Sequence, residues 1–190
     1  CRTLTDALQQ KKWHAEDLFF YGEVWQSWAH HSRFSSMDAQ ALLRDINAAQ
    51  AKTFHYLHHA DWLIITLGSA FSYRLTKLGA AASTEAPTAV GMPVANCHRA
   101  PAQWFQKHLM TITEITELLD NFLHQLFYIN PKVRIIFTIS PVRHIRDGVV
   151  ANNRSKARLM EAVHHLVDKF ERLHYFPSYE LVIDVLRDYR

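Results

Sequence analysis

The chain has 190 residues, of which 48% are hydrophobic and 21% are charged, a balance typical of one globular domain rather than a disordered chain. Its formal net charge is only +3 and its basic residues are scattered, which argues against electrostatic binding of nucleic acid. Two cysteines, Cys1 and Cys97, exclude a disulfide scaffold and a four-cysteine zinc site, and no apolar run is long enough to span a bilayer. The composition favours a soluble, intracellular α/β protein.

The two ends of the sequence indicate a fragment. Residues 1–8 begin with Cys rather than with Met or a signal peptide, and their pattern is that of a helix entered partway along. Residues 186–190 stop without a helix cap or a polar tail. We therefore expect the chain to be an internal piece of a longer protein.

The first half of the chain predicts a helix, a strand and a loop. A capping box at Ser35–Asp38 starts a helix whose apolar residues keep helical spacing to Leu57. Trp62–Leu67 is a continuous apolar run of the kind found in parallel strands covered on both faces. Residues 77–93, rich in Gly, Ala, Ser, Thr and Pro, predict a mobile loop inserted in a single domain of residues 1–190.

The second half continues the alternation of helices and strands. The capping box Thr111–Glu114 starts a second helix, which ends before Pro131. Val133–Ile139 is the second apolar run and predicts a second strand. A third helix opens near Asn153, and its apolar stripe consists of Leu159, Val163, Leu166, Val167 and Phe170.

The last part of the sequence completes the predicted fold class. Tyr175–Phe176 predicts a short third strand, and Leu181–Leu186 fits either a helix or a strand. The alternating order predicts a doubly wound α/β sandwich in which the first two strands are adjacent and parallel. Ligands bind at the carboxyl ends of the strands in such sheets, which directs attention to residues 68–71 and 140–144.

Several segments, spread in order along nearly the whole chain, resemble the GSCFA domain. They are Asp17–Phe20, Trp25–Phe34, Asp61–Ala70, Val94–His98, Thr138–Gly148, Tyr175–Glu180 and Leu186–Arg190. Residues 80–91 look like an insertion. The resemblance implies similarity to the SGNH (GDSL-like) hydrolases, and hence a three-layer, flavodoxin-like α/β/α sandwich with a parallel sheet and a serine nucleophile.

The resemblance also implies that the catalytic pair lies outside this sequence. The nucleophilic serine of the family belongs to a Gly-Ser-Cys-Phe-Ala motif that would precede Cys1, and the histidine base belongs to an Asp-x-x-His-Pro segment that would follow Arg190. The chain alone is then expected to be inactive, with an incomplete sheet that favours self-association. The implied substrate is a small-molecule or carbohydrate ester, and no cofactor is implied.

Gly68 and Asn96 are the candidates for an oxyanion hole. The resemblance places Leu67–Ser69 where many SGNH hydrolases have Leu-Gly-x-Asn-Asp, but the asparagine of that segment is absent here. Asn96, in a second loop, is a candidate for the missing amide, and alternatively caps a turn before Pro101. Gly68 fits either a close approach of the backbone to a ligand or a plain turn.

Ser69 is a candidate for substrate binding, with hydrogen bonding to the backbone as the alternative. Its surroundings, Leu-Gly-Ser-Ala, do not match the Gly-x-Ser-x-Gly nucleophile elbow. Arg143 and His144 are candidates for the cleft because they closely follow the second strand. Arginine holds carboxylates or phosphates with two parallel bonds, and histidine moves protons near neutral pH. The alternative is an Arg143–Asp147 pair that makes the loop rigid.

The 13 histidines do not predict a metal site. The pairs His30-His31, His58-His59 and His164-His165 are adjacent residues that point apart on a helix, and no His-Glu-x-x-His motif occurs. His30, His31 and His98 lie in the segments of family resemblance and are candidates for substrate binding. We interpret as packing residues the aromatic side chains Trp13, Phe19, Phe20, Trp25 and Trp28.

Two classes of function fit the sequence. The first is the central part of an SGNH-type hydrolase that acts on an ester or acetyl-carbohydrate bond. The second is a non-catalytic binding module that keeps the same fold and cleft. The presence of the two family motifs on either side of the chain would favour the first.

Overall fold

The computed structural model describes residues 2–82 and 90–187, which divide between two compact units. We call Tyr56–Phe71 with Leu109–Arg190 the sheet unit, and Arg2–His55 with Ser72–His108 the hairpin unit. Three elements cross the division: α2 (Ala39–His59), β5 (Phe71–Leu75) and β7 (Phe105–Leu109).

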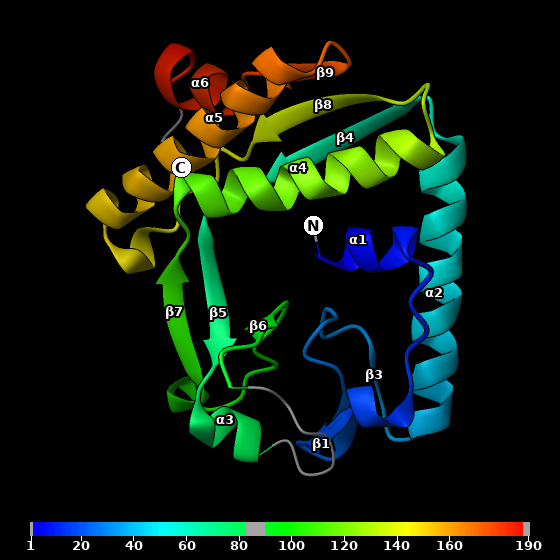
Figure 1. Cartoon of the computed structure of the whole chain (residues 1–190). Helices are drawn as coiled ribbons and strands as arrows, with labels where there is room; N and C mark the ends of the chain where they lie inside the picture. Colours follow the sequence, from blue (N-terminus) through cyan, green and yellow to red (C-terminus); the bar gives the residue numbers. More distant parts are fainter. Residues whose placement is uncertain (1, 83–89, 188–190) are drawn as a thin grey trace. The chain divides into compact units, whose positions relative to one another are not determined.

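Three parallel strands in the order β4-β8-β9 form the sheet of the sheet unit (Figure 1). They are β4 (Trp62–Leu67), β8 (Arg134–Ile139) and β9 (Leu173–Phe176). The prediction that the two apolar runs form adjacent parallel strands is therefore confirmed, and so is the short third strand. The chain is of the mixed α/β class, as its alternating pattern indicates.

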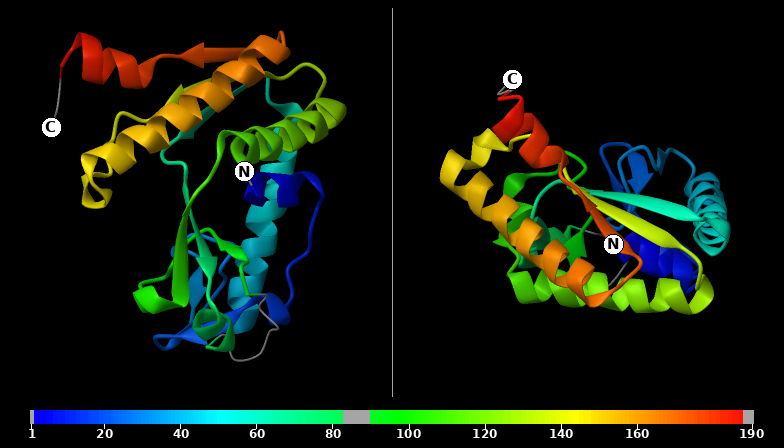
Figure 2. Two further views of the ribbon diagram at one scale, coloured as in Figure 1. Left: turned by 60° about the vertical axis from the view of Figure 1, so that its left-hand side comes forward. Right: turned by 90° about the horizontal axis from the view of Figure 1, so that it is seen from above.

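Two long helices cover one face of this sheet. The helices α4 (Ile112–Ile129) and α5 (Val149–Lys169) pack against each other, and α5 contacts β8 and β9. Both lie on the same side of the strands in the right-hand view of Figure 2. The core of this unit lies between the two helices and the sheet. Its completely buried side chains include Phe122, Ile135, Phe137, Ile139 and Val163. Burial of each such side chain contributes about 1.5–3 kcal/mol and holds the strand ends in place.

On the other face of the sheet, side chains of the two outer strands are exposed in the described residues, whereas Thr138 of the central strand is buried. Trp62, Ile64 and Phe176 are 49%, 66% and 52% exposed. This corrects the expectation that Trp62–Leu67 is covered on both faces. Alternate residues of a strand point to opposite faces, and the even-numbered residues of β4 point away from α4 and α5.

The helix boundaries follow from local capping. Thr111 and Glu114 form the predicted capping box at the start of α4. The helix predicted after Ser35–Asp38 is α2, and the Asp38 carboxylate caps it by accepting from the Gln40 N–H. The part of the box assigned to the serine is wrong, because Ser35–Ser36 forms strand β3. The helix α5 begins at Val149, earlier than expected.

The ambiguous segment after β9 is helical. It consists of α6 (Ser178–Glu180) and a π-helical turn, η4 (Leu181–Val185). A short 3₁₀ turn, η3 (Ile145–Asp147), lies between β8 and α5.

The hairpin unit contains two small sheets, in the orders β1-β2-β3 and β6-β5-β7. In the first, β1 (Phe19–Tyr21) and β2 (Val24–Gln26) form a hairpin through Gly22 and Glu23, whose φ angles of 61° and 67° match the positive values that a tight type I′ turn requires. The remaining elements are α1 (Arg2–Leu8), η1 (Ala15–Asp17), α3 (Lys77–Ala81), β6 (Pro93–Val94) and η2 (Ala102–Trp104).

The expected loop over residues 77–93 is only partly described. Lys77–Ala81 is the helix α3, capped by the Thr76 hydroxyl, and Pro93 begins β6, so these two ends of the segment are not loop. Residues 83–89, the middle of the expected loop, lie outside the described residues.

In the part of the chain that the structure describes, no helix is both long enough and apolar enough to cross a membrane.

The close contact of α3 with η2 leaves no room for a side chain at Gly79. A Cβ atom at this position would lie 2.4 Å from the Trp104 carbonyl oxygen. We expect Gly79→Ala to destabilise the hairpin unit by about 1–3 kcal/mol, despite the better helix propensity of alanine. Urea unfolding followed by tryptophan fluorescence measures the loss. Gly68→Ala is the control, because a Cβ there meets no atom within 4 Å, and equal midpoints for the two variants would contradict the prediction.

Candidate functional site

The carboxyl ends of the three parallel strands meet at one edge of the sheet unit. Because β4, β8 and β9 run in the same direction, the segments that follow them lie at this edge. We call it the strand-end site, and its backbone segments are Gly68–Ala70, Ser140–His144 and Ser178–Tyr179. In open parallel sheets this is the edge where ligands bind.

Three buried polar side chains of α5 form hydrogen bonds with backbone groups of these segments. Asn152, Ser155 and Lys156 are each 2% exposed and stand at positions i, i+3 and i+4, so they share one face of the helix. The Asn152 side-chain oxygen accepts from the His144 N–H at 2.9 Å, and the Ser155 hydroxyl accepts from the Ala70 N–H at 2.7 Å. The segments after β4 and β8 are thus fixed to one helix.

Lys156 connects the ends of the two central strands directly. Its Nζ donates to the Gly68 carbonyl oxygen at 2.7 Å and to the Ser140 carbonyl oxygen at 2.6 Å, and lies 5.7 Å from the centre of the Tyr179 ring. No carboxylate among the described residues lies within ion-pair distance of this ammonium group. Burial lowers the pKa of Lys156, because removal from water disfavours its charged form.

The third strand is attached to the second by a short network. The Ser178 hydroxyl donates to the Ile139 carbonyl oxygen at 2.6 Å and also bonds to the Thr138 hydroxyl. The Tyr175 hydroxyl donates to the Glu180 carboxylate at 2.8 Å, and burial together with this carboxylate raises the pKa of Tyr175 well above its ordinary value. Hydrogen bonds therefore connect the ends of all three strands at this edge.

The structure brings four of the predicted residues together in the sheet unit. Gly68 is exposed, and its carbonyl oxygen accepts from Lys156. Ser69 is half-buried, and its hydroxyl oxygen lies 3.3 Å from that of Ser155 and accepts from the Phe71 N–H at 3.1 Å. These bonds match the alternative in which Ser69 bonds to nearby backbone.

Arg143 and His144 also belong to this edge. Arg143 is half-buried, and its charge lowers the pKa of Tyr179, although burial, the largest cause, raises it overall. His144 is exposed, and its backbone is fixed by Asn152. The side chain of Asp147, the alternative partner of Arg143, lies outside the described residues.

The other four predicted residues belong to the hairpin unit. The Asn96 side-chain oxygen accepts from the His98 N–H at 2.7 Å, which is the turn predicted as the alternative role of Asn96. His98 and His30 are buried and both bond to Ser27, His98 to its carbonyl oxygen at 2.9 Å and His30 to its hydroxyl at 3.2 Å. His31 is exposed. That Asn96 shares a site with Gly68 and Arg143 stays a prediction.

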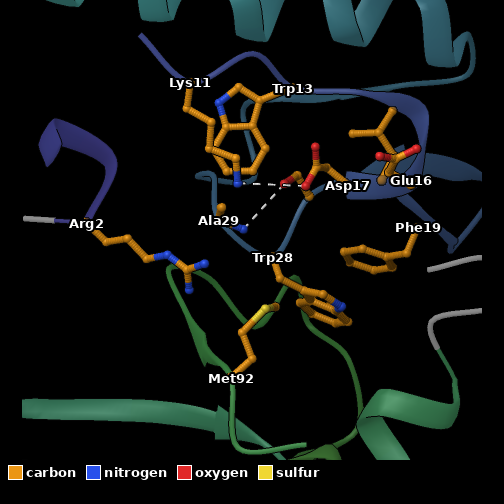
Figure 3. A pocket seen from close by; sticks show the side chains of 11 residues that line it. Arg2, Lys11, Trp13, Glu16, Asp17, Phe19, Trp28, Ala29 and Met92 are labelled. Carbon is orange, nitrogen blue, oxygen red and sulfur yellow. Dashed lines mark hydrogen bonds and ion pairs between the residues drawn. The ribbon is translucent and has the colours of Figure 1, made fainter. Parts of the chain in front are cut away.

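The hairpin unit contains a small cavity of about 120 Å³ (Figure 3). Its walls include Trp13, Phe19 and Trp28, which are all nearly fully buried, and the Phe19 and Trp28 rings stack with their centres 3.7 Å apart. Lys11 lies over the Trp13 ring and 3.8 Å from the Asp17 carboxylate, at the edge of the cavity. The interpretation of these three aromatic residues as packing residues is confirmed. Phe20, in contrast, is 47% exposed.

The sequence model described as the GSCFA family matches residues 1–190. The chain belongs to the GSCFA family. No curated protein and no solved structure matches it.

Asn152, Ser155 and Lys156 of this GSCFA-family chain were not among the predicted site residues. A signal was available, because the apolar stripe of α5 through Leu159 and Val163 extends backwards by steps of three and four to residues 156, 155 and 152. Polar residues on a buried stripe must find hydrogen-bond partners. The stripe therefore predicts buried polar contacts at the start of this helix.

Metal ligation and thiol chemistry have no support in the described part of the GSCFA chain. Its described residues contain no group of three or more His, Cys, Asp or Glu side chains placed to hold a metal ion. Cys97 is a free, half-buried thiol, and burial raises its pKa, which disfavours the reactive thiolate.

Proposed function

We propose that this chain forms the central part of an SGNH-type serine hydrolase that acts on ester or acetyl-carbohydrate bonds. The observation that carries the proposal is the strand-end site, where α5 fixes the backbone after β4 and β8 through Asn152, Ser155 and Lys156. Fixed backbone amides at the carboxyl edge of a parallel sheet are what stabilisation of an oxyanion requires.

In this proposal the chain supplies the scaffold and the cleft, and the family motifs supply the catalytic pair. The described hydrogen bonds of Ser69 are with Ser155 and the Phe71 backbone, so Ser69 has no histidine or lysine base. The sequence contains neither a Gly-Ser-Cys-Phe-Ala motif nor an Asp-x-x-His-Pro segment. Gly68, Arg143 and His144 are then cleft residues.

The proposal includes a complete three-layer, flavodoxin-like sandwich. The exposed face of the β4-β8-β9 sheet, with Trp62, Ile64 and Phe176, is the surface that a further layer of helices would cover. Parallel sheets are stable when both faces are covered, which supports this extension of the observed fold.

We expect the 190-residue chain alone to show no esterase activity, and the chain joined to segments carrying both family motifs to hydrolyse a short-chain aryl acetate. A site that lacks its nucleophile–base pair loses orders of magnitude in rate. Release of the phenolate measures turnover. Ser69→Ala in the longer protein tests whether Ser69 is the nucleophile. Because alanine keeps the backbone N–H at this position, turnover should stay far above that of the 190-residue chain.

Two outcomes would contradict the proposal. Equal turnover by both proteins, abolished by Ser69→Ala, would make Ser69 the nucleophile and the chain catalytically complete. Binding of an acetylated sugar by the longer protein without hydrolysis would favour the alternative of a non-catalytic binding module.

A further inference from the structure

We propose that Lys156 is a positioning residue of the strand-end site, which orients the Gly68–Ser69 peptide so that the Ser69 N–H is presented to the reacting group. The inference rests on the proposed hydrolase function. It adds to that function a residue on α5 and a specific backbone donor.

The ammonium group of Lys156 is buried and is surrounded by polar groups of the strand ends. A buried ammonium group is costly unless it is well hydrogen-bonded, and here two carbonyl oxygens and the face of the Tyr179 ring take the place of water. Simple packing at this position would be served by an apolar side chain. The charged group instead spans two strand ends, at Gly68 and Ser140, which fixes the spacing of the two segments that follow.

The planar peptide bond between Gly68 and Ser69 fixes the direction of the Ser69 N–H. A trans peptide is planar, so its C=O and N–H groups point in opposite directions. Because the Gly68 carbonyl oxygen points to Lys156, the Ser69 N–H points away from it. The Ser140 carbonyl oxygen is held in the same way, but the next residue is Pro141, which has no N–H. Of the two peptides that Lys156 holds, only the first presents a donor.

Two of the three successive backbone amides at this loop already have hydrogen-bond acceptors. The Ala70 N–H donates to the Ser155 hydroxyl, and the Phe71 N–H donates to the Ser69 hydroxyl. In the described residues the Ser69 N–H has no acceptor. Among these three successive amides, the one that Lys156 orients is therefore the one left for a ligand.

Gly68, the first residue of this peptide, borders open space. Gly68 has no positive φ, and a Cβ there would meet no atom within 4 Å, so the local fold does not require glycine. A ligand can therefore enter the space next to Gly68, and an oxyanion bound there would need to lie 2.7–3.1 Å from the Ser69 N–H. The charge of Lys156, transmitted through the Gly68 carbonyl, strengthens the N–H as a donor.

The test compares two variants in the longer protein that carries both family motifs. Lys156→Met removes the ammonium group. The matched control is Asn130→Ala, because the buried Asn130 side chain also donates to two carbonyl oxygens, those of Leu57 and Ala60, which precede β4 at the opposite edge of the sheet. Both variants lose a buried bridge between two backbone segments, but only the first affects the strand-end site.

We expect Lys156→Met to lower kcat for an aryl acetate about 100-fold with little change in KM, as loss of oxyanion stabilisation does. Asn130→Ala should lower the melting temperature and leave kcat of the folded protein unchanged. A folded Lys156→Met protein with kcat within threefold of wild type would overturn the inference. If Lys156→Met does not fold, Lys156→Gln, which keeps a donor at this position, replaces it with the same criteria.

Amide hydrogen exchange separates this inference from the proposed function. In the wild-type protein Ala70 and Phe71 should be protected and Ser69 should exchange rapidly. Lys156→Met should reduce the protection of Ala70 at least tenfold, and Asn130→Ala should not. Unchanged protection at Ala70 would overturn the positioning role whether or not the protein hydrolyses esters. Changed protection without esterase activity would instead remove the proposed function and leave Lys156 as the residue that orders this loop.

Discussion

Phe137→Ala is expected to lower the free energy of unfolding of the sheet unit by about 4 kcal/mol, the typical cost of removing a fully buried aromatic side chain. Phe137 lies in β8, the central strand, and is completely buried. Its neighbours on both sides are strands and its ring faces the helix layer, so the cavity cannot collapse easily. The loss of unfolding free energy is measured by urea unfolding, with hydrogen exchange of the α4 and α5 amides as the probe.

The control for this prediction is Phe176→Ala. Phe176 lies at the end of the neighbouring strand β9 and is 52% exposed, so the same deletion of side-chain atoms should cost less than about 1 kcal/mol. A similar loss for both variants would show that the exposed face of the sheet is covered in solution.

Acid should destabilise the hairpin unit between pH 6.5 and about 4 because of His30. Burial, with smaller contributions from the charges of Lys11 and His98, lowers the pKa of His30 to about 4, while Asp17 acts in the opposite direction. Below pH 6.5 the unfolded chain binds a proton that the folded protein does not take up until about pH 4. The free energy of unfolding therefore falls with pH, by about 2–3 kcal/mol over this range.

The measurement is urea unfolding from pH 8 to pH 4, followed by tryptophan fluorescence. Trp13, Trp25, Trp28 and Trp104 all lie in the hairpin unit. In the variant His30→Gln the free energy of unfolding should depend less steeply on pH over this range. The control is His31→Gln, a substitution of the exposed neighbouring residue, which should keep the wild-type pH dependence. Parallel curves for the wild type and His30→Gln would contradict the assignment of this acid sensitivity to His30.

Elements with strong local signals were predicted correctly from the residues alone. The apolar runs at β4 and β8 are continuous and β-branched, and the capping box at Thr111 satisfies the free amides of α4 with residues only three positions apart. The box expected at Ser35 was wrong because Ser35–Ser36 pairs with β2, a contact that local pattern does not contain. Short strands of the hairpin unit were missed for the same reason.

The candidate site was predicted only in part. Strand order and the carboxyl-edge rule led to Gly68, Ser69, Arg143 and His144, which the structure places in one unit. Asn96, His30, His31 and His98 belong to the other unit, a division that arises from contacts between segments far apart in sequence.

The role of α5 at the site follows from long-range contacts that local pattern does not contain. Helical periodicity places Lys156 on the buried stripe, but it does not predict which groups accept hydrogen bonds from its ammonium group. Gly68 is 88 residues away, and its carbonyl oxygen meets Lys156 only because parallel pairing of β4 with β8 brings the two strand ends side by side beneath the helix. Periodicity fixes which side of an element is buried, whereas the partners of a buried polar group depend on which other elements arrive there.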